Sequence, residues 1–302
     1  MTNRSHERRS TCGGSVVWLT RWMRNRLLVV LVGVLLVAGC GAQPAPAGHP
    51  TDTACETQPG GEKAESGVRI IGVNLVAKHC AEFEVTNSGS RAAVYTVTFA
   101  FLASSGEALV TPQRTVPVVG PGRTVKDIVR VGELRSELAR VKIVKVRSVP
   151  AAEAPSAECP SSGLRLYADD DAEAAMGLRV LGIHLENCGP RARQLKGYPK
   201  LELLDEKHKA IRTVKILHGG NAITSSPTGA DGPARPVVLK PGERASAHLV
   251  WRNTVEAGGA NISSPYVRVW AEPGAAPIML TPELDLGTTG KLGVGPWKKD
   301  QP

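Results

Sequence analysis

Short apolar runs of strand length recur along the chain, separated by turns that are rich in Gly, Ser and Pro. In the run at 93–102, Tyr95, Val97 and Phe99 alternate with smaller residues, which is the period of a strand with one face in a core. The pattern therefore predicts an all-β protein. Strands are expected at 68–76, 81–87, 93–102, 123–131 and 140–149 in one half, and at 177–187, 201–205, 211–217, 236–242, 244–251 and 266–272 in the other.

The two halves share landmarks in the same order. An asparagine ends a strand in each (Asn87 and Asn187), and a Pro-Gly turn later leads into an alternating strand (121–122 and 241–242). Many short strands with frequent turns favour β-sandwiches. We therefore expect two immunoglobulin-like sandwiches in tandem. Their expected bounds are 55–149 and 159–286, with a Pro/Ala-rich linker at 150–158 and a disordered tail at 287–302.

The amino terminus has the order of a signal peptide. A basic stretch ends at Arg26, and the thirteen residues of 27–39 carry no charge. A membrane-spanning helix needs about 20 apolar residues, whereas a basic stretch, a shorter apolar run and small residues mark a segment that is removed after export. We expect 1–39 to be this signal peptide, although an uncleaved anchor is an alternative.

Val37-Ala38-Gly39-Cys40 resembles the bacterial lipobox. The resemblance implies cleavage between Gly39 and Cys40, with diacylglycerol on the Cys40 sulfur. Two or three acyl chains, at about 0.8 kcal/mol per buried CH₂, would give a stable anchor. The protein is therefore expected on the outer face of the cytoplasmic membrane, with 40–54 as a flexible tether. Whether export uses the general route or the twin-arginine route stays open, because Arg8-Arg9 is followed by no apolar pair.

Net charge argues against a nucleic-acid partner. The whole chain has a formal charge of +9 from 37 basic and 28 acidic residues, but six arginines and only one glutamate fall within 1–39. The remainder holds 31 basic and 27 acidic residues, and the bases are scattered. A nucleic-acid footprint is usually a basic patch or stripe, so no such partner is expected.

Six cysteines can be sorted by position. Cys12 lies within the signal peptide and Cys40 takes the lipid, which leaves four in the exported chain. Disulfides persist outside the cytoplasm, and four cysteines allow three pairings. Because they fall as two close couples, the economical pairing is one bridge per domain. The expected bridges are Cys55 with Cys80 and Cys159 with Cys188.

A resemblance covers residues 159–286. The motifs are Cys159, Asn187, Leu195-Lys-Gly-Tyr-Pro199, Leu239-Lys-Pro-Gly242 and Trp251. They are similar to a family of actinobacterial secreted and lipid-anchored proteins that is catalogued as a domain of unknown function. Two departures from the family pattern are the position of the second cysteine directly after the asparagine and the lack of a later cysteine pair. Residues 55–150 more loosely resemble immunoglobulin-like modules of bacterial envelope proteins. Neither resemblance carries a catalytic residue.

Motif searches predict no enzyme site and no cofactor. The sequence has no Gly-x-Ser-x-Gly, no Ser-x-x-Lys and no His-x-x-x-His, so neither a catalytic nor a metal-ligand motif stands out. His184 and His248 are expected to be ordinary strand histidines that could approach each other. The acidic run 169–171 lacks the spacing of a calcium loop and is expected to be solvated. Tyr198 and Trp251 are interpreted as core or turn anchors, and the side that Trp270 faces is undecided.

We therefore expect a lipid-anchored extracytoplasmic protein that acts as a non-catalytic binding or interaction module of the cell envelope. Its partners would be the membrane, through Cys40, and an unidentified envelope protein or ligand. The polar loop 218–236 is a candidate contact surface, since long loops on rigid sheets often carry recognition. Two alternatives remain: an envelope hydrolase with an unrecognised site, and a passive spacer or assembly subunit of a membrane complex.

Overall fold

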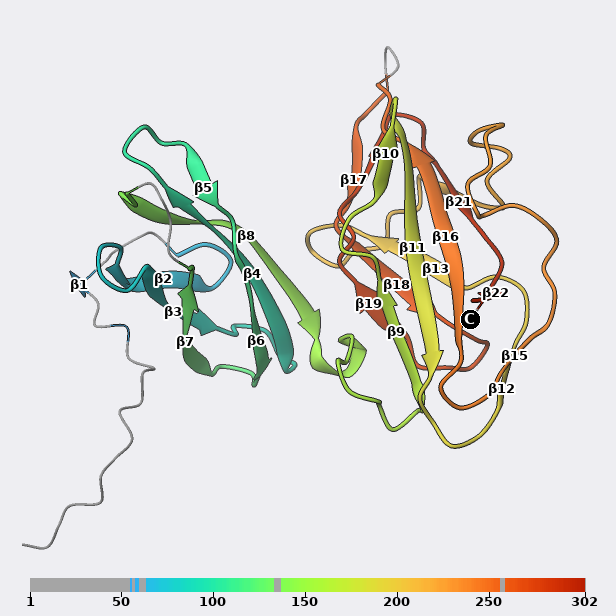
Figure 1. Ribbon diagram of the computed structural model, residues 1–302, viewed down its shortest axis with the longest axis horizontal. Helices are drawn as coiled ribbons and strands as arrows, with labels where there is room; N and C mark the ends of the chain where they lie inside the picture. Colours follow the sequence, from blue (N-terminus) through green and yellow to red (C-terminus); the bar gives the residue numbers. More distant parts are fainter. Residues whose placement is uncertain (1–54, 56–57, 60–63, 133–136, 256–258, 302) are drawn as a thin grey trace, which may run out of the picture. The chain divides into compact units, whose positions relative to one another are not determined.

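The computed structural model of the chain describes residues 55, 58–59, 64–132, 137–255 and 259–301 (Figure 1). These residues form strands and one short 3-10 turn, η1 (Ala151–Glu153), and contain no α-helix. The all-β prediction is confirmed. Within the described ranges, no helix has the length and apolar character needed to cross a membrane. The expected signal peptide, Cys40 and the tether up to residue 54 lie outside those ranges.

Strands between Gln58 and Pro150 form two four-stranded sheets, which we call the first region. One sheet has the order β1-β2-β3-β7, and in the other β4 pairs with β8 along one edge and with β5 and β6 along the other. Phe83 and Phe99, one from each sheet, lie 4.8 Å apart between ring centroids, so the core lies between the sheets. The strands are β1 (Gln58–Pro59), β2 (Val68–Asn74), β3 (Cys80–Thr86), β4 (Ala93–Leu102), β5 (Ala108–Val110), β6 (Gln113–Val119), β7 (Thr124–Arg130) and β8 (Arg140–Pro150).

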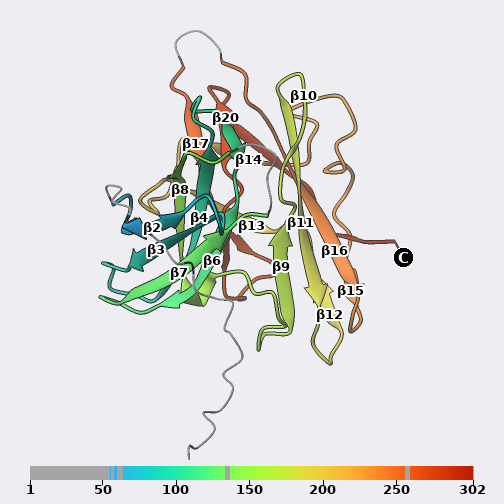
Figure 2. The same ribbon diagram turned by 60° about the vertical axis from the view of Figure 1, so that its left-hand side comes forward.

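Residues 159–301 form the second region, with its own larger core. Its seven-stranded sheet is centred on β11 and β16, which run side by side in Figures 1 and 2. Of three smaller sheets, one has the order β13-β18-β19, one pairs β12 with β15, and one pairs β17 with β20. The strands are β9 (Leu164–Ala168), β10 (Glu173–Ala175), β11 (Leu178–Asn187), β12 (Arg193–Leu195), β13 (Lys200–Leu204), β14 (Lys215–His218), β15 (Val237–Leu239), β16 (Arg244–Arg252), β17 (Ile262–Ser264), β18 (Tyr266–Trp270), β19 (Ile278–Leu280), β20 (Leu284–Gly287), β21 (Lys291–Val294) and β22 (Lys298–Lys299).

A buried asparagine after β3 ties the turns of the first region together. The side-chain amide of Asn87 donates to the backbone carbonyls of Arg91 and Val119, each at 2.8 Å, and its side-chain oxygen accepts from the N–H of Gly89 at 2.9 Å. The N–H of Gly122 donates to the backbone carbonyl of the same asparagine at 2.7 Å. Asn87 therefore holds a corner that would otherwise leave buried backbone groups unpaired.

Asn187 repeats these contacts in the second region. Its amide donates to the carbonyls of Arg191 (2.9 Å) and Leu239 (2.8 Å), and its side-chain oxygen accepts from Gly189 N–H at 3.2 Å. Gly242 N–H donates to its backbone carbonyl at 2.7 Å. The shared landmark expected from the sequence is confirmed as a shared hydrogen-bonding unit. That the regions fold as separate domains divided at 150–158 stays a prediction.

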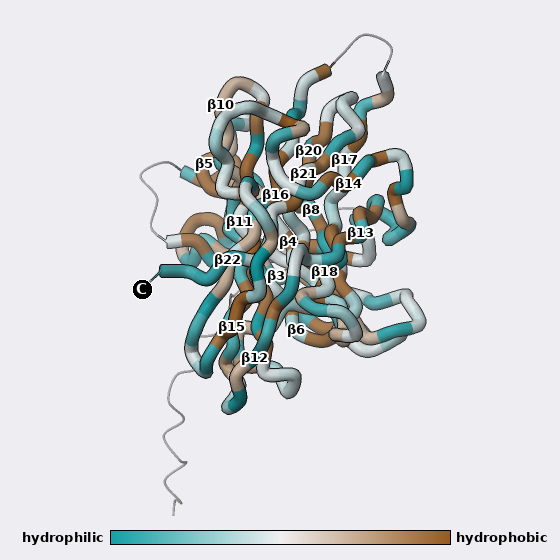
Figure 3. The backbone as a smooth tube through the Cα atoms, turned by 90° about the vertical axis from the view of Figure 1, so that its right-hand side faces the viewer, coloured by the Kyte–Doolittle hydropathy of each residue, from teal (hydrophilic) through white to brown (hydrophobic). Residues whose placement is uncertain are grey.

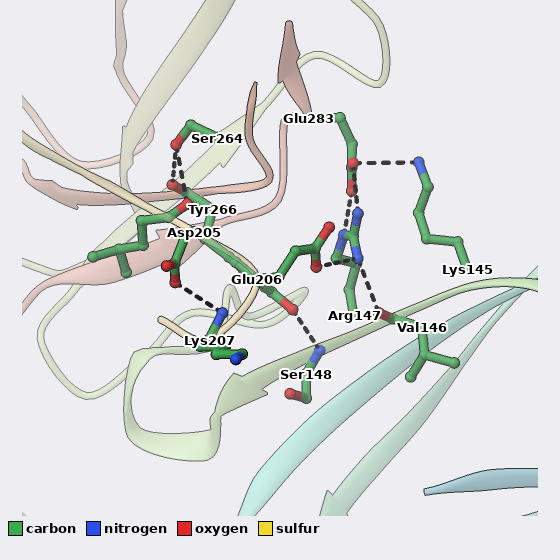
Figure 4. A network of polar contacts seen from close by, with 11 residues as sticks. Lys145, Val146, Arg147, Ser148, Asp205, Glu206, Lys207, Ser264, Tyr266 and Glu283 are labelled. Carbon is green, nitrogen blue, oxygen red and sulfur yellow. Dashed lines mark hydrogen bonds and ion pairs between the residues drawn. The ribbon is translucent and has the colours of Figure 1, made fainter. Parts of the chain in front are cut away.

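The end of β8 contacts the second region through the polar network of Figure 4. Arg147 pairs bidentately with Glu283 and donates to Glu206 at 3.0 Å, while the N–H of Ser148 donates to the hydroxyl of Tyr266 at 3.2 Å. Burial raises the pKa of Tyr266, so this hydroxyl stays protonated. A small apolar cluster accompanies the network: Val149, Leu204, Tyr266 and Met279.

Two disulfides join the cysteines in the pairing expected from the sequence. Cys55 is bonded to Cys80, with Cα atoms 6.3 Å apart, and Cys159 is bonded to Cys188, with Cα atoms 5.7 Å apart. Each bridge closes a loop within one region. The adjacency of Cys188 to the asparagine corner, a departure from the family pattern, is therefore compatible with a bridge to Cys159.

The expected disordered tail at 287–302 is wrong. Residues 291–294 form β21, which lies between β14 and β16, and 298–299 form β22, which pairs with β16. Trp297 between them is 1% exposed and belongs to the core of the second region. The segment gave no alternating pattern because β21 is buried on both faces for most of its length, and such a strand has no period of two.

The longest predicted strands agree with the structure, whereas most missed strands are short. Along the strands, hydrophobic and hydrophilic residues follow one another at short intervals (Figure 3), as expected where one face is buried. Strands of two to five residues offer too few positions for that period to be recognised. Those not predicted are β1, β5, β6, β9, β10, β12, β17, β19, β20, β21 and β22.

Candidate functional site

A broken strand distinguishes the second region from the first. After the Asn87 corner the chain continues as the unbroken ten-residue strand β4, but after the Asn187 corner it forms β12, leaves the ladder at 196–199 and resumes as β13. Gly197 has a φ of 75°, which side chains other than glycine rarely adopt, and proline at 199 has no N–H to donate. β12 pairs with β15 whereas β13 pairs with β18, so the chain changes sheets at the break.

The break opens a groove of about 380 Å³ on the surface. Tyr198 and Trp270 supply its aromatic walls, Lys196 and Lys200 line it, and the turn 272–275 closes the other side. Trp270 is held opposite Lys200 in the β13–β18 ladder. The Lys200 ammonium lies 4.7 Å from the centroid of the indole, within the range of a cation–π contact.

Contacts outside the groove hold the Tyr198 ring in place. Its ring stacks on that of His218 with centroids 4.0 Å apart and planes 2° from parallel, and it also packs against the core of the second region while remaining half-buried. The interpretation of Tyr198 as a core or turn anchor is thus incomplete, since the ring also lines the groove. Trp270 is half-buried and faces the groove, which settles its side.

Trp251, the other aromatic anchor expected from the sequence, is a core residue. It is 1% exposed, and its indole N–H donates to Asp285 Oδ1 at 2.9 Å. A buried indole normally needs such a partner. Trp251 therefore does not contribute to the groove.

The carboxyl-terminal segment secures the break. The backbone N–H of Trp297 donates to the carbonyl of Gly197 at 3.0 Å, and its indole N–H donates to the carbonyl of Ala271 at 3.0 Å. One residue thus satisfies carbonyls on both sides of the groove, at the strand break and at the start of the turn. No pattern in the sequence around Lys196 predicts the contact between Gly197 and Trp297.

Positive charge dominates the groove. Lys196 and Lys200 are exposed, and neither forms an ion pair with any carboxylate in the described part of the chain. Among the described residues, Glu272 is the one acidic residue lining the groove, and it lies 3.6 Å from Arg193. A ligand with negative charge would therefore meet two unneutralised ammonium groups beside aromatic rings.

The two strand histidines lie on neighbouring strands of the large sheet. His184 Nε2 and Asp169 Oδ1 are hydrogen-bonded at 2.9 Å, and the His184 ring stacks on that of Tyr167. Burial, together with Lys298 and His184, lowers the pKa of His248. No group of three or more His, Cys, Asp or Glu side chains in the described ranges is arranged to hold a metal ion. The remainder of the acidic run, 170–171, is exposed, as expected of a solvated loop.

Loop 218–236 is fastened to the sheet rather than standing free. Ala230 is fully buried, and the Lys298 ammonium donates to the carbonyl of Gly229 at 2.6 Å. A Cβ atom at Gly229 would lie 2.9 Å from the ring of His248, so glycine is required for this close approach. A contact role for the rest of the loop stays a prediction.

Comparison with known proteins gives one match. Residues 159–298 match the family model described as Domain of unknown function (DUF4232). The match covers a little under half of the chain and includes the whole groove together with Trp297. No curated protein and no solved structure shows significant similarity to the chain.

Proposed function

We propose that the chain is a lipid-anchored extracytoplasmic binding module whose second region binds a ligand in the groove at the broken strand. The lipobox-like 37–40 supports the anchor, and two disulfides suit an exported protein because they persist in oxidising compartments. The groove supports the binding role. Non-catalytic binding is the first hypothesis because the sequence contains no Gly-x-Ser-x-Gly, Ser-x-x-Lys or His-x-x-x-His pattern.

The observation that carries the proposal is the break between β12 and β13. The first region shows that the same asparagine corner can lead into a continuous strand. The break removes hydrogen bonds from the strand ladder and leaves the Tyr198 and Trp270 side chains partly exposed. Departures from local regularity of this kind occur mainly at functional sites, and a hollow with aromatic walls and a few charged groups is a usual ligand site.

The anchor is tested by intact mass. Protein isolated from membranes should begin at Cys40 and carry the mass of a diacylglyceryl group, and a Cys40→Ser variant should carry no diacylglyceryl mass. Protein that still begins at Met1, or that carries an unmodified Cys40, would contradict the anchor.

The binding site is tested with a photo-crosslinking residue at Ala275, which lines the groove. We expect adducts with one envelope component in intact cells, and loss of those adducts when Trp270→Ala is added. The matched control is the same residue at Val118, a 60% exposed position in the first region. Equal labelling at both positions would refute a specific groove.

The two alternatives predict other outcomes. A passive spacer predicts no specific adduct at 275 and mislocalisation of another membrane protein when the chain is deleted. An envelope hydrolase predicts turnover in pooled activity screens against wall and glycan substrates. Adducts at 275 without turnover favour the binding module.

A further inference from the structure

A second hollow, of about 310 Å³, lies on the other side of the turn 272–275. Its walls come from both layers of the second region, because β9 and β11 contribute on one side and β18 and β19 on the other. The hollow therefore lies where the two layers meet. The side chains that form its walls are aliphatic: Leu164, Leu166, Leu185, Val269, Ala271 and Ile278.

One cation lines this aliphatic hollow, and two more line the groove beyond the turn 272–275. Arg193 lines the hollow, donates to the carbonyl of Ser162 at 3.0 Å and lies 3.6 Å from Glu272. The turn that begins at Glu272 is the wall shared with the groove, where Lys196 and Lys200 lie without acidic partners among the described residues. The aliphatic space and the two lysines without acidic partners thus lie on two sides of one turn, and we call Arg193, Lys196 and Lys200 the cationic rim.

We infer that the ligand of this site is an anionic amphiphile, with its acyl chain in the aliphatic hollow and its carboxylate or phosphate at the cationic rim. This inference rests on the proposed function and names its ligand class. Charge complementarity favours an anion at the rim. A sugar or a peptide suits the hollow poorly, because its hydroxyl or amide groups would lose water there without gaining hydrogen bonds.

The size of the hollow limits the chain length. The hollow has a volume of about 310 Å³, so it can take only part of a long acyl chain. Each added methylene that leaves water should strengthen binding about fourfold. Affinity should therefore rise with chain length and level off once further methylenes lie outside the hollow.

Glu272 opposes an anion at the rim. Its carboxylate is the acidic group nearest to Arg193, so an arriving anion competes with it for the guanidinium. Glu272→Gln keeps the shape of the side chain and removes the charge. We expect it to strengthen binding severalfold, whereas a purely apolar interaction would be indifferent to it.

The test uses the full chain with Cys40→Ser, titrated with saturated fatty acids of six to sixteen carbons by displacement of a fluorescent fatty acid. Lysophosphatidylglycerol of the same chain lengths forms the second arm and distinguishes a phosphate head from a carboxylate. Methyl esters of the same acids control for the charge. We expect saturable binding, the length dependence above, and at least tenfold weaker binding of the esters.

The charge variants complete the test. Lys196→Glu with Lys200→Glu should weaken binding at least tenfold, and the control pair Lys126→Glu with Lys142→Glu, exposed lysines of the first region, should leave it unchanged. All four positions are on the surface, so folding is preserved. Binding that does not saturate, ignores chain length or responds equally to both pairs overturns the inference. If adducts at 275 persist in that case, the proposed function stands and only the ligand class fails.

Discussion

The two regions begin from the same corner and end in different surfaces. In the first, the chain leaves Asn87 along β4, which pairs over its whole length and buries its aromatic side chains in the core. In the second, the chain leaves Asn187, breaks after the three residues of β12 and leaves Tyr198 partly exposed. The corner is thus a structural unit that both regions need, whereas the break is a local change that only one of them carries.

Stability in the second region depends on a segment with no equivalent in the first. Trp297→Ala should remove a buried indole and its hydrogen bond to the carbonyl of Ala271, at a cost of about 3–5 kcal/mol. Chemical denaturation measures the loss, and hydrogen exchange should show faster exchange in β12 and β13 but not in β4. The control Phe99→Ala should show faster exchange in β4 but not in β12 and β13. An unchanged denaturation midpoint in Trp297→Ala would show that the break needs no such support.

The two disulfides should contribute alike. They close loops of similar length, with sequence separations of 25 and 29, so replacing either pair by alanine should cost about 3–4 kcal/mol in the chain-entropy model. Denaturant titration of the two double-alanine variants checks this. A cost confined to one bridge would mean that the other region is already ordered without its bridge.

The asparagine corners should be equivalent in energy. Asn87→Ala and Asn187→Ala each leave two backbone carbonyls and one N–H without a side-chain partner in a buried site, which should cost about 2–3 kcal/mol in each case. Denaturant titration again gives the values. If either substitution left the free energy of unfolding unchanged, the two corners would not be equivalent.

A smaller difference between the regions should appear on acidification. Burial is the main cause of a lowered pKa in both His208 and His248, and both lie in the second region. The unfolded chain takes up these protons at about pH 6.5, whereas the folded chain resists them. Their contribution to stability is therefore present above that pH and is lost as the pH falls below it.

Denaturation midpoints at pH 7.5 and 5.5 test this sign. The difference between the two pH values should shrink in the His208→Gln, His248→Gln double variant, because carboxylates contribute equally to both proteins. A variant with an unchanged or larger difference would contradict the stated cause.

Sequence periodicity was sufficient for the long strands and for the corners. Alternation predicts β4, and the repeated Asn with its later Pro-Gly turn predicts the two corners. The sequence also contains a longer repeat that identifies the corners more clearly, because Asn-x-Gly-x-Arg-Ala occurs at 87–92 and at 187–192. Aligning the regions on that motif would have exposed the difference that follows it, where Lys-Gly-Tyr-Pro interrupts the second copy.

The groove itself could not be predicted because its parts are distant in the chain. Trp270 reaches Lys200 only through the β13–β18 register, and the break is secured by Trp297, nearly 100 positions away. The tail was misjudged for a related reason: β21 gains its stability from strands on both sides, parallel to β14 and antiparallel to β16. Such partners leave no period in the local sequence.

The central claim is that the broken strand binds an anionic amphiphile, and hydrogen exchange with and without decanoate tests it most directly. We expect slower exchange at 196–198 and 272–275 in the presence of decanoate, with β4 unchanged. Slower exchange in β4 or in loop 218–236 instead, or no change at the groove, would contradict it.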